Sequence, residues 1–139
     1  MVRQLASGAF RRIEDWLNLK ELDLPIDRLI EAGYQLYITS DHGNVDLTGI
    51  GVPAEGSLAE ERGERVRIYS DALIRERSLS SIPGTRVLQP RGLPETYLPL
   101  FAPYGAGFLQ RSRTAISHGG SAIEELVVPF VRVSKKVVQ

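Results

Sequence analysis

The chain has 139 residues, of which 42% are hydrophobic and 24% charged, as expected for one globular domain or part of one. Its 17 lysines and arginines balance 17 aspartates and glutamates, so no net charge directs it to nucleic acid or to a membrane surface. It has no cysteine, which excludes disulfides, thiol catalysis and thiolate metal sites, and no apolar run reaches membrane-spanning length.

Apolar residues recur at steps of three and four from Val2 to Leu17, which is the stripe of an amphipathic helix. We expect Trp16, which lies on this stripe, to pack in the core. Charged residues interrupt the stretch from Arg3 onward, so we do not expect it to be a signal peptide. The chain is therefore predicted to be cytoplasmic and to have no membrane partner.

The stretch LDLPIDRLIEAGYQ predicts a second helix, in which Pro25 suits the first turn and Gly33 can end the helix. The residues that follow, YQLYITS at 34–40, are rich in aromatic and β-branched side chains and predict a strand. A helix, a glycine and then a strand is the element order of an α/β layer.

Residues 43–66 form a long glycine-rich stretch that we expect to be irregular, and connections of this length are usually functional or disordered. A short strand is predicted at 66–69, followed by a helix in DALIRERSL that Asp71 or Ser70 could cap. Prolines and glycines interrupt residues 82–107, which are therefore predicted to be mostly loop.

A third strand is predicted at 114–117, ending at His118. The letters SAIE then match a capping box, in which Ser121 accepts from the amide of Glu124 and the Glu124 carboxylate reaches back. The last strand is expected at 128–133, where Pro129 favours a sheet edge or a strand start. The pattern predicts one α/β domain over residues 1–139, with a partial, mostly parallel sheet and flanking helices.

Both histidines of the chain are followed by glycine, in YITSDHGNVD and in ISHGGSAIEE. Asp41 and His42 end a predicted strand, and ligands of open α/β sheets lie beyond the carboxyl ends of strands. Gly43 gives the backbone the freedom to turn both side chains toward one ion. The alternative is a local turn, in which Asp41 bonds nearby amides and the imidazole is half buried.

The segments ITSDHGN, GERVRIYSD and SHGGSAIEELVVPFV, in this order, resemble the carboxyl-terminal half of the PglZ domain. This is the phage growth limitation and bacteriophage exclusion branch of the alkaline phosphatase superfamily, and the resemblance runs from about residue 2 to residue 133. It implies an alkaline-phosphatase-like domain of which this chain is the C-terminal fragment. The Asp-His-Gly motif alone would also fit the cofactor-independent phosphoglycerate mutases.

The resemblance further implies a two-metal site that clamps the attacking and leaving oxygens of a phosphate ester. Asp41 and His42 match ligands of one metal, and His118 matches a ligand of the second. Nitrogen and carboxylate ligands suit zinc or manganese. The superfamily's nucleophile and its upstream metal ligands precede the Asp-His-Gly motif and have no match here, so we expect this chain alone to be inactive.

The resemblance therefore predicts a fragment of a metal-dependent phosphoesterase, a hydrolase of phosphate monoesters or diesters in its complete form. Two alternatives are a non-catalytic fold remnant or partner-docking module of the defence system, and a phosphoglycerate-mutase-like enzyme of phosphoryl transfer. The partners implied are other phage-defence proteins, with a phosphate ester or a nucleic acid as the substrate. We also expect self-association into a homo-oligomer, because an open apolar face at the edge of a partial sheet tends to bind another such face.

Arg65 and Arg67 are candidates for binding the substrate phosphate, with an exposed strand edge paired with Glu61 and Glu64 as the alternative. Asp46 and Glu55 are weaker candidates for orienting His42, and the alternative for both is solvation or bonding within a turn. Glu124 is interpreted as the capping partner of Ser121, and the alternative is that it or Glu125 is a metal ligand.

If the two His-Gly corners, His42–Gly43 and His118–Gly119, bind metal, the imidazoles of His42 and His118 converge at the carboxyl edge of the sheet. Two neighbouring strand ends would place them roughly 5–10 Å apart. The turn interpretation predicts no convergence, and a separation beyond about 15 Å would contradict a two-metal site.

Overall fold

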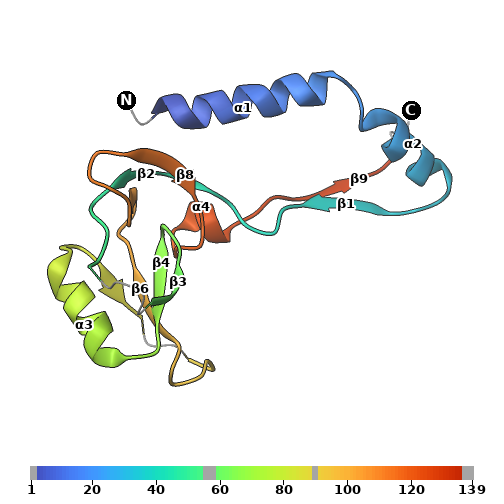
Figure 1. The fold of residues 1–139 in the computed structure, drawn as a ribbon. Helices are drawn as coiled ribbons and strands as arrows, with labels where there is room; N and C mark the ends of the chain where they lie inside the picture. The colour runs from blue at the N-terminus through green and yellow to red at the C-terminus, as the bar shows by residue number, and fades with distance from the viewer. Residues whose placement is uncertain (1–2, 55–58, 89–90, 136–139) are drawn as a thin grey trace.

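The computed structural model describes residues 3–54, 59–88 and 91–135 (Figure 1). The helices are α1 (Arg3–Asn18), α2 (Asp23–Glu31), α3 (Ala72–Ser81) and α4 (Ile123–Leu126). The strands are β1 (Leu36–Thr39), β2 (Val45–Gly49), β3 (Ala59–Arg62), β4 (Val66–Tyr69), β5 (Arg86–Val87), β6 (Leu98–Phe101), β7 (Ala106–Gly107), β8 (Thr114–Ser117) and β9 (Phe130–Val133). The mixed α/β content agrees with the sequence.

The molecule divides into a lobe, residues 43–127, and an arm, residues 11–40 and 129–135 (Figure 1). In the arm, β1 pairs with β9, and α2 and most of α1 extend away from the lobe. The helix α1 also contacts the lobe, at β2 and β8. The arm is therefore built from both ends of the chain, whereas the lobe is built from its middle.

The local signals for the predicted helices agree with the structure. The first helix ends at Asn18, one residue beyond the apolar stripe, and α2 ends before Gly33, whose φ of 86° few residues other than glycine adopt. The helix α3 begins after Asp71, whose carboxylate accepts from the amides of Leu73 at 2.7 Å and Ile74 at 3.3 Å. Of the two predicted caps for α3, Asp71 is the one used.

All four predicted strands exist, but the stretches expected to be irregular contain further strands. Residues 43–66 include β2 and β3, and residues 82–107 include β5, β6 and β7. In β2 the residues Val45, Leu47 and Gly49 are buried and alternate with half-buried ones. This alternation is a strand pattern, but glycines and polar residues around it weaken the local signal. Pairing with neighbours on both sides decides that β2 is a strand.

The prediction of a mostly parallel sheet is wrong. The described strands form three small sheets, in the orders β1-β9, β7-β2-β8 and β3-β4-β6-β5, and only the pairing of β2 with β7 is parallel. Parallel neighbours need crossover connections, usually helical. Here a short turn joins β3 to β4. A long segment connects β2 to β8, and β8 runs in the opposite direction to β2.

The core lies in the lobe, where α3 covers the sheet that contains β4 and β6. It is formed by the buried residues Tyr69, Ile82, Leu100, Ala102 and Phe108. Trp16 is not part of it: its exposed fraction is 44%, so the expectation that it packs in the core is wrong. The neighbouring apolar residues Ile13 and Leu17 of α1 are exposed as well, so no other described element covers this part of the stripe.

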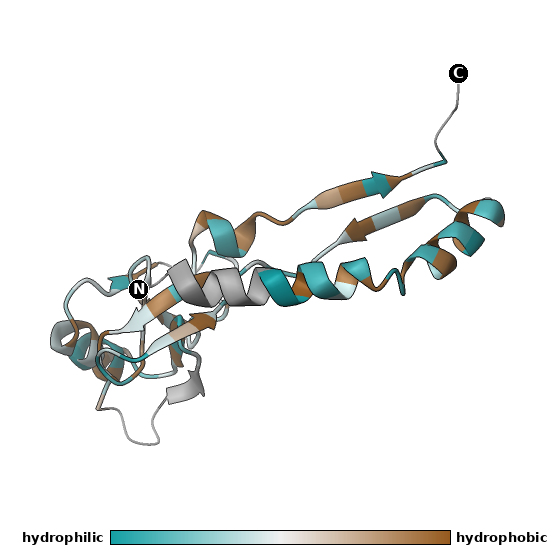
Figure 2. Ribbon diagram, turned by 90° about the horizontal axis from the view of Figure 1, so that it is seen from above, coloured by the Kyte–Doolittle hydropathy of each residue, from teal (hydrophilic) through white to brown (hydrophobic). Residues whose placement is uncertain are grey.

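Most of the other large apolar residues of the arm are also exposed. Figure 2 shows apolar positions along α2, β1 and β9. They are Ile13, Leu17, Leu19, Leu22, Leu24, Leu29, Tyr34, Tyr37, Ile38, Phe130 and Val131. No helix in the described part of the chain is long and apolar enough to cross a membrane. The arm is thus held together by the β1–β9 ladder and by local contacts such as the stacked rings of Tyr37 and Phe130, with centroids 5.2 Å apart.

Candidate metal centre

The first histidine corner lies between β1 and β2. One carboxylate oxygen of Asp41, Oδ1, accepts from the backbone amide of His42 at 3.0 Å, as in a local turn. The other, Oδ2, lies 3.6 Å from His42 Nε2, which is too long for a good hydrogen bond. The opposite ring nitrogen, Nδ1, lies 2.9 Å from the carbonyl oxygen of Gly43. Because a carbonyl only accepts, Nδ1 donates this bond, and Nε2 is the ring nitrogen beside the Asp41 carboxylate.

The second corner begins where β8 ends, and it meets the first. The imidazoles of His42 and His118 are stacked, with centroids 3.7 Å apart and an interplanar angle of 17°. The predicted convergence is therefore confirmed, at a shorter distance than the expected spacing. It does not arise at the carboxyl edge of a parallel sheet, because β2 and β8 are antiparallel and bring the start of one beside the end of the other.

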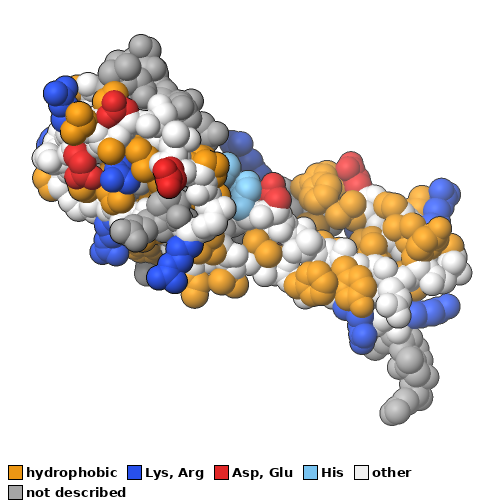
Figure 3. Space-filling model, turned by 90° about the horizontal axis from the view of Figure 1, so that it is seen from below, with side chains coloured by type: hydrophobic (Ala, Val, Ile, Leu, Met, Phe, Trp, Pro, Cys, Tyr) orange, Lys and Arg blue, Asp and Glu red, His pale blue; other side chains and the backbone are white. Residues whose placement is uncertain are grey.

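The histidine pair lies at the surface, where the lobe meets the arm (Figure 3). The side chain of Asp41 is 87% exposed and that of His42 is 37% exposed. A ligand that approached from solvent would therefore reach the Asp41 carboxylate and the edge of the His42 ring without any rearrangement of the lobe.

Asp41 and His42 fit a divalent cation in two respects. Two ligand atoms at about 2.0–2.1 Å from a tetrahedral zinc stand about 3.3 Å apart, close to the observed 3.6 Å between Nε2 and Oδ2. Histidines that bind metal through one nitrogen commonly donate the other N–H to a carbonyl or carboxylate, as His42 does to Gly43. Among the described residues, however, no three His, Asp or Glu side chains are arranged around one point. The pair is a partial site.

Of the two acids proposed to orient His42, Asp46 makes no hydrogen bond to its ring among the described residues. Asp46 lies in β2, so the turn alternative for this residue is wrong, and the ring N–H of His42 faces Gly43 instead. The Oδ1 atom of Asp46 is buried and has no hydrogen-bond partner among the described residues. Glu55 lies outside the described residues.

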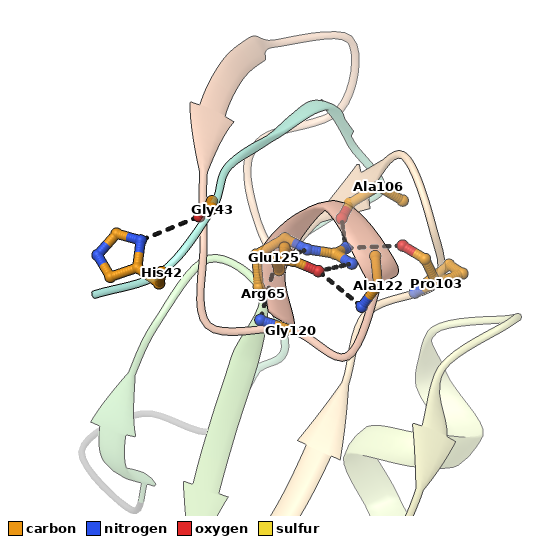
Figure 4. Close-up of polar contacts among 8 residues, drawn as sticks. All are labelled: His42, Gly43, Arg65, Pro103, Ala106, Gly120, Ala122 and Glu125. Carbon is orange, nitrogen blue, oxygen red and sulfur yellow. Dashed lines mark hydrogen bonds and ion pairs between the residues drawn. The ribbon is translucent and has the colours of Figure 1, made fainter. Parts of the chain in front are cut away.

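Arg65 and Arg67 are buried, with exposed fractions of 1% and 5%, so the alternative of an exposed strand edge is wrong. Arg65 donates to the Glu125 carboxylate from Nε at 2.9 Å and from Nη2 at 3.1 Å (Figure 4). Its Nη1 donates to the carbonyls of Pro103 and Ala106. Arg67 donates to the carbonyl of Phe108 at 3.4 Å and lies over the Phe108 ring. Both guanidinium groups face protein acceptors.

The predicted capping box does not form with Ser121 and Glu124, and only its returning carboxylate contact exists, displaced by one residue. The helix α4 begins at Ile123 with Ala122 as its N-cap, and the carboxylate that reaches back belongs to Glu125, which accepts from the amide of Ala122 at 3.0 Å. Glu124 points outward and accepts from the hydroxyl of Tyr104 at 2.8 Å, and this bond raises the pKa of Tyr104 above its ordinary value. The sequence could not show which of Glu124 and Glu125 bonds to the helix start, because both positions fit a short helix after a serine.

Glu125 is ionised within the protein. Burial raises its pKa, but hydrogen bonds from Arg65 and from the amides of Ala122 and Gly120 outweigh burial, so that the pKa is lower than the ordinary value. Sequence reasoning missed this residue as an organiser of the site. The available signal was a pair of glutamates six and seven residues after His118, close enough in the chain to fold back onto it.

Comparison with known protein families gives a match over most of the chain. The family model of the BREX system PglZ alkaline phosphatase-like domain matches residues 1–133. No curated protein and no solved structure matches the chain. The matched range includes both histidine corners, Arg65 and Glu125.

Proposed function

This chain belongs to the PglZ family of alkaline phosphatase-like domains of BREX phage-defence systems, and we propose on that basis that Asp41, His42 and His118 are ligands in a divalent-metal site for phosphate-ester hydrolysis. The observation that carries the proposal is the meeting of the two imidazoles, which come from positions 76 residues apart and have centroids 3.7 Å apart. Other proteins of the same BREX system are the partners that the family membership suggests.

The residues fit zinc or manganese, the metals suited to imidazole and carboxylate ligands. Such a metal supplies Lewis-acid polarisation of a phosphoryl oxygen and a stabilised oxygen nucleophile. The chain's own part is to present the Nε2 lone pair of His42 beside the Asp41 carboxylate, with the proton held on Nδ1 by the Gly43 carbonyl. Arg65 and Arg67 take no part in the proposal as it stands, because their guanidinium groups face acceptors inside the lobe.

Calorimetric titration of the purified chain with Zn²⁺ and with Mn²⁺ tests this proposal. We expect binding by the unmodified chain and a loss of about tenfold or more in affinity in each of His42→Ala and His118→Ala, since removal of a ligand or of its orienting partner has effects of that order. Glu76→Gln is the control, because the Glu76 side chain is exposed on α3, where it pairs with Arg75. Equal affinity in all four proteins, or no binding by any, would refute the metal site.

Activity is a separate measurement. We expect no turnover of a generic phosphodiester by this chain alone, because a metal clamp needs a nucleophile to complete the chemistry. Turnover that His42→Ala abolishes would show instead that the chain carries a complete site.

We also propose that two copies of the chain associate through their arms. The exposed surface is 10558 Å², whereas a compact protein of 15.4 kDa exposes about 7,200 Å². The excess, roughly 3,400 Å², exceeds the 800 Å² or so that each partner buries in a standard protein interface. The exposed apolar residues of the arm supply such an interface, and each of β1 and β9 has one strand edge unpaired among the described residues.

Light scattering after size exclusion tests the association. We expect a dimer for the unmodified chain and a monomer for Phe130→Asp, since Phe130 is 72% exposed on β9 of the arm. Leu73→Asp is the matched control, because Leu73 is 73% exposed on α3 of the lobe. A monomeric unmodified chain at high concentration, or dissociation by the control alone, would contradict the proposal.

A further inference from the structure

One residue touches the backbone of both histidine corners (Figure 4). The carbonyl oxygen of Glu125 accepts from the amide of Gly43 at 3.0 Å, directly after His42. The carboxylate of the same residue accepts from the amide of Gly120 at 2.9 Å, two positions after His118. Glu125 thus bonds to two segments that are far apart in the chain.

Arg65 fixes the orientation of that carboxylate. Its Nε and Nη2 donate to the two Glu125 oxygens in a two-point arrangement, while Nη1 donates to the carbonyls of Pro103 and Ala106. The two side chains are only 2% and 1% exposed. A planar guanidinium held at three nitrogens leaves the carboxylate little freedom to rotate, so Glu125 is tied to β4 and to the segment before β7.

This contact requires glycine at one position after each histidine, Gly43 and Gly120. A Cβ on Gly43 would overlap the backbone carbonyl of Glu124. A Cβ on Gly120 would lie 2.5 Å from Glu125 Oε2 and 2.8 Å from Arg65 Nη2. Neither glycine has a positive φ, so the reason for glycine at these positions is the close approach of Glu124, Glu125 and Arg65. Gly119 is different, because its φ of 93° already favours glycine.

The strand pairing alone does not bring the two rings together. The β2–β8 ladder ends at the pair Val45 and Ser117, so the position opposite His118 belongs to Asn44. His42 lies two residues beyond that position, past the end of the ladder. The amide of Gly43 bonds to Glu125 instead of to β8, and this bond turns the chain before β2 back toward His118.

We propose that Glu125, fixed by Arg65, is a positioning residue that holds His42 and His118 together. The proposal rests on the proposed function only for the use of the two imidazoles as metal ligands. Their juxtaposition is a property of the chain itself and can be measured without metal, substrate or activity.

Nuclear magnetic resonance of a histidine-labelled chain tests the proposal. The chain has 2 histidines, so selective labelling yields one set of ring signals from each, and stacked rings give an inter-ring nuclear Overhauser effect. We expect this effect in the unmodified chain and its loss in Glu125→Gln, which keeps the side-chain volume and removes the charge. Glu76→Gln should retain it, because the Arg75–Glu76 pair has a similar distance, 3.0 Å, but lies on the surface of α3.

Gly120→Ala is the second variant, for the case in which Glu125→Gln does not fold. Its added methyl group displaces the ends of the Glu125 and Arg65 side chains and leaves both charges in place, so the inter-ring effect should again be lost while the amide spectrum of β4 and β6 stays dispersed. Retention of the inter-ring effect in either folded variant, or its absence from the unmodified chain, would overturn the proposal.

Addition of Zn²⁺ to the same samples separates the two proposals. Shifts of both ring signals in the unmodified chain, reduced in Glu125→Gln, are expected if the positioned imidazoles bind metal. If Zn²⁺ leaves the ring signals unmoved, the metal assignment fails, whereas the inter-ring effect still decides whether Glu125 positions the histidines.

Discussion

The lobe and the arm differ in which side chains they bury. The lobe buries Arg65 and Glu125 almost completely, while the arm leaves Trp16 and Phe130 exposed. In the lobe, Arg65 and Glu125 have hydrogen-bond partners inside the protein that replace water. In the arm, β1 and β9 pair with each other, but no second layer of described residues covers the exposed apolar side chains. An amphipathic sequence thus determines a helix or a strand locally, whereas burial needs a partner surface.

The difference also concerns stability. Regions with few buried apolar contacts open locally at a lower free energy than the core does. The lobe has a cluster of buried apolar residues, and α2 of the arm has no buried residue. We therefore expect the lobe to contain most of the free energy of unfolding and the arm to respond little to substitution unless it is covered by a second copy.

The largest effect is expected from Glu125→Ala. It leaves the Arg65 guanidinium buried without its carboxylate, and breaking a buried ion pair from one side costs about 3–5 kcal/mol. Urea unfolding followed by circular dichroism would measure the loss. Emission from Trp16, the single tryptophan and part of the arm, should change little in native buffer.

Glu76→Ala is the control for that comparison and should stay within about 0.5 kcal/mol of the unmodified chain, because Glu76 is exposed. If Glu125→Ala were equally mild, the ion pair would not be the buried contact that distinguishes the lobe.

The second effect contrasts two leucines. Leu100→Ala creates a cavity beside Tyr69 and Phe108 in the core, and we expect a loss of about 2–5 kcal/mol in the free energy of unfolding. Leu17→Ala removes a side chain that is 54% exposed on α1, with an expected change of about 0.5 kcal/mol or less. Equal losses of unfolding free energy in the two variants, measured by urea unfolding at low protein concentration, would show that the arm is packed in solution.

Acid should weaken the lobe through Glu125. The folded-state pKa of this carboxyl is lower than the ordinary value of 4.5, so its contribution is fully present above about pH 4.5 and is lost as pH falls through the folded pKa. Unfolding measured between pH 5 and pH 2 should show a steeper decline for the unmodified chain than for Glu125→Gln. Parallel declines would mean that other carboxyl groups dominate the acid response.

The smallest effect concerns helix capping. Asp71→Ala removes the side-chain bonds to Leu73 and Ile74 at the start of α3, and loss of an N-cap costs about 1 kcal/mol. Ser70→Ala should be close to neutral, because Ser70 was the alternative cap and α3 does not use it. In the arm, α2 has no side-chain cap, so no substitution at Leu22 should have a comparable effect on that helix. Thermal unfolding of the two lobe variants distinguishes them.

Local signals predicted the elements that depend on residues near in sequence. The helices α1, α2 and α3, the stop at Gly33 and the cap at Asp71 follow from periodicity, glycine conformation and side-chain bonding within one turn. Strands β1, β4, β8 and β9 were predicted because aromatic and β-branched residues are concentrated in them. The residue pattern of the Asp-His-Gly and Ser-His-Gly-Gly segments was also sufficient to indicate the family.

Other features were decided by contacts between distant residues. Strand direction, the existence of β2, the exposure of Trp16 and the choice of Glu125 over Glu124 all depend on which surfaces meet, and no window of neighbouring residues contains that information.

The sequence by itself determined that two His-Gly corners exist and that they end or precede strands, because those properties belong to the residues and their neighbours. Only the tertiary structure decided that the corners meet, since their meeting depends on an antiparallel ladder and on one buried glutamate with bonds to both. It also decided why glycine stands at positions 43 and 120: Glu124, Glu125 and Arg65 approach so closely that a side chain would not fit there.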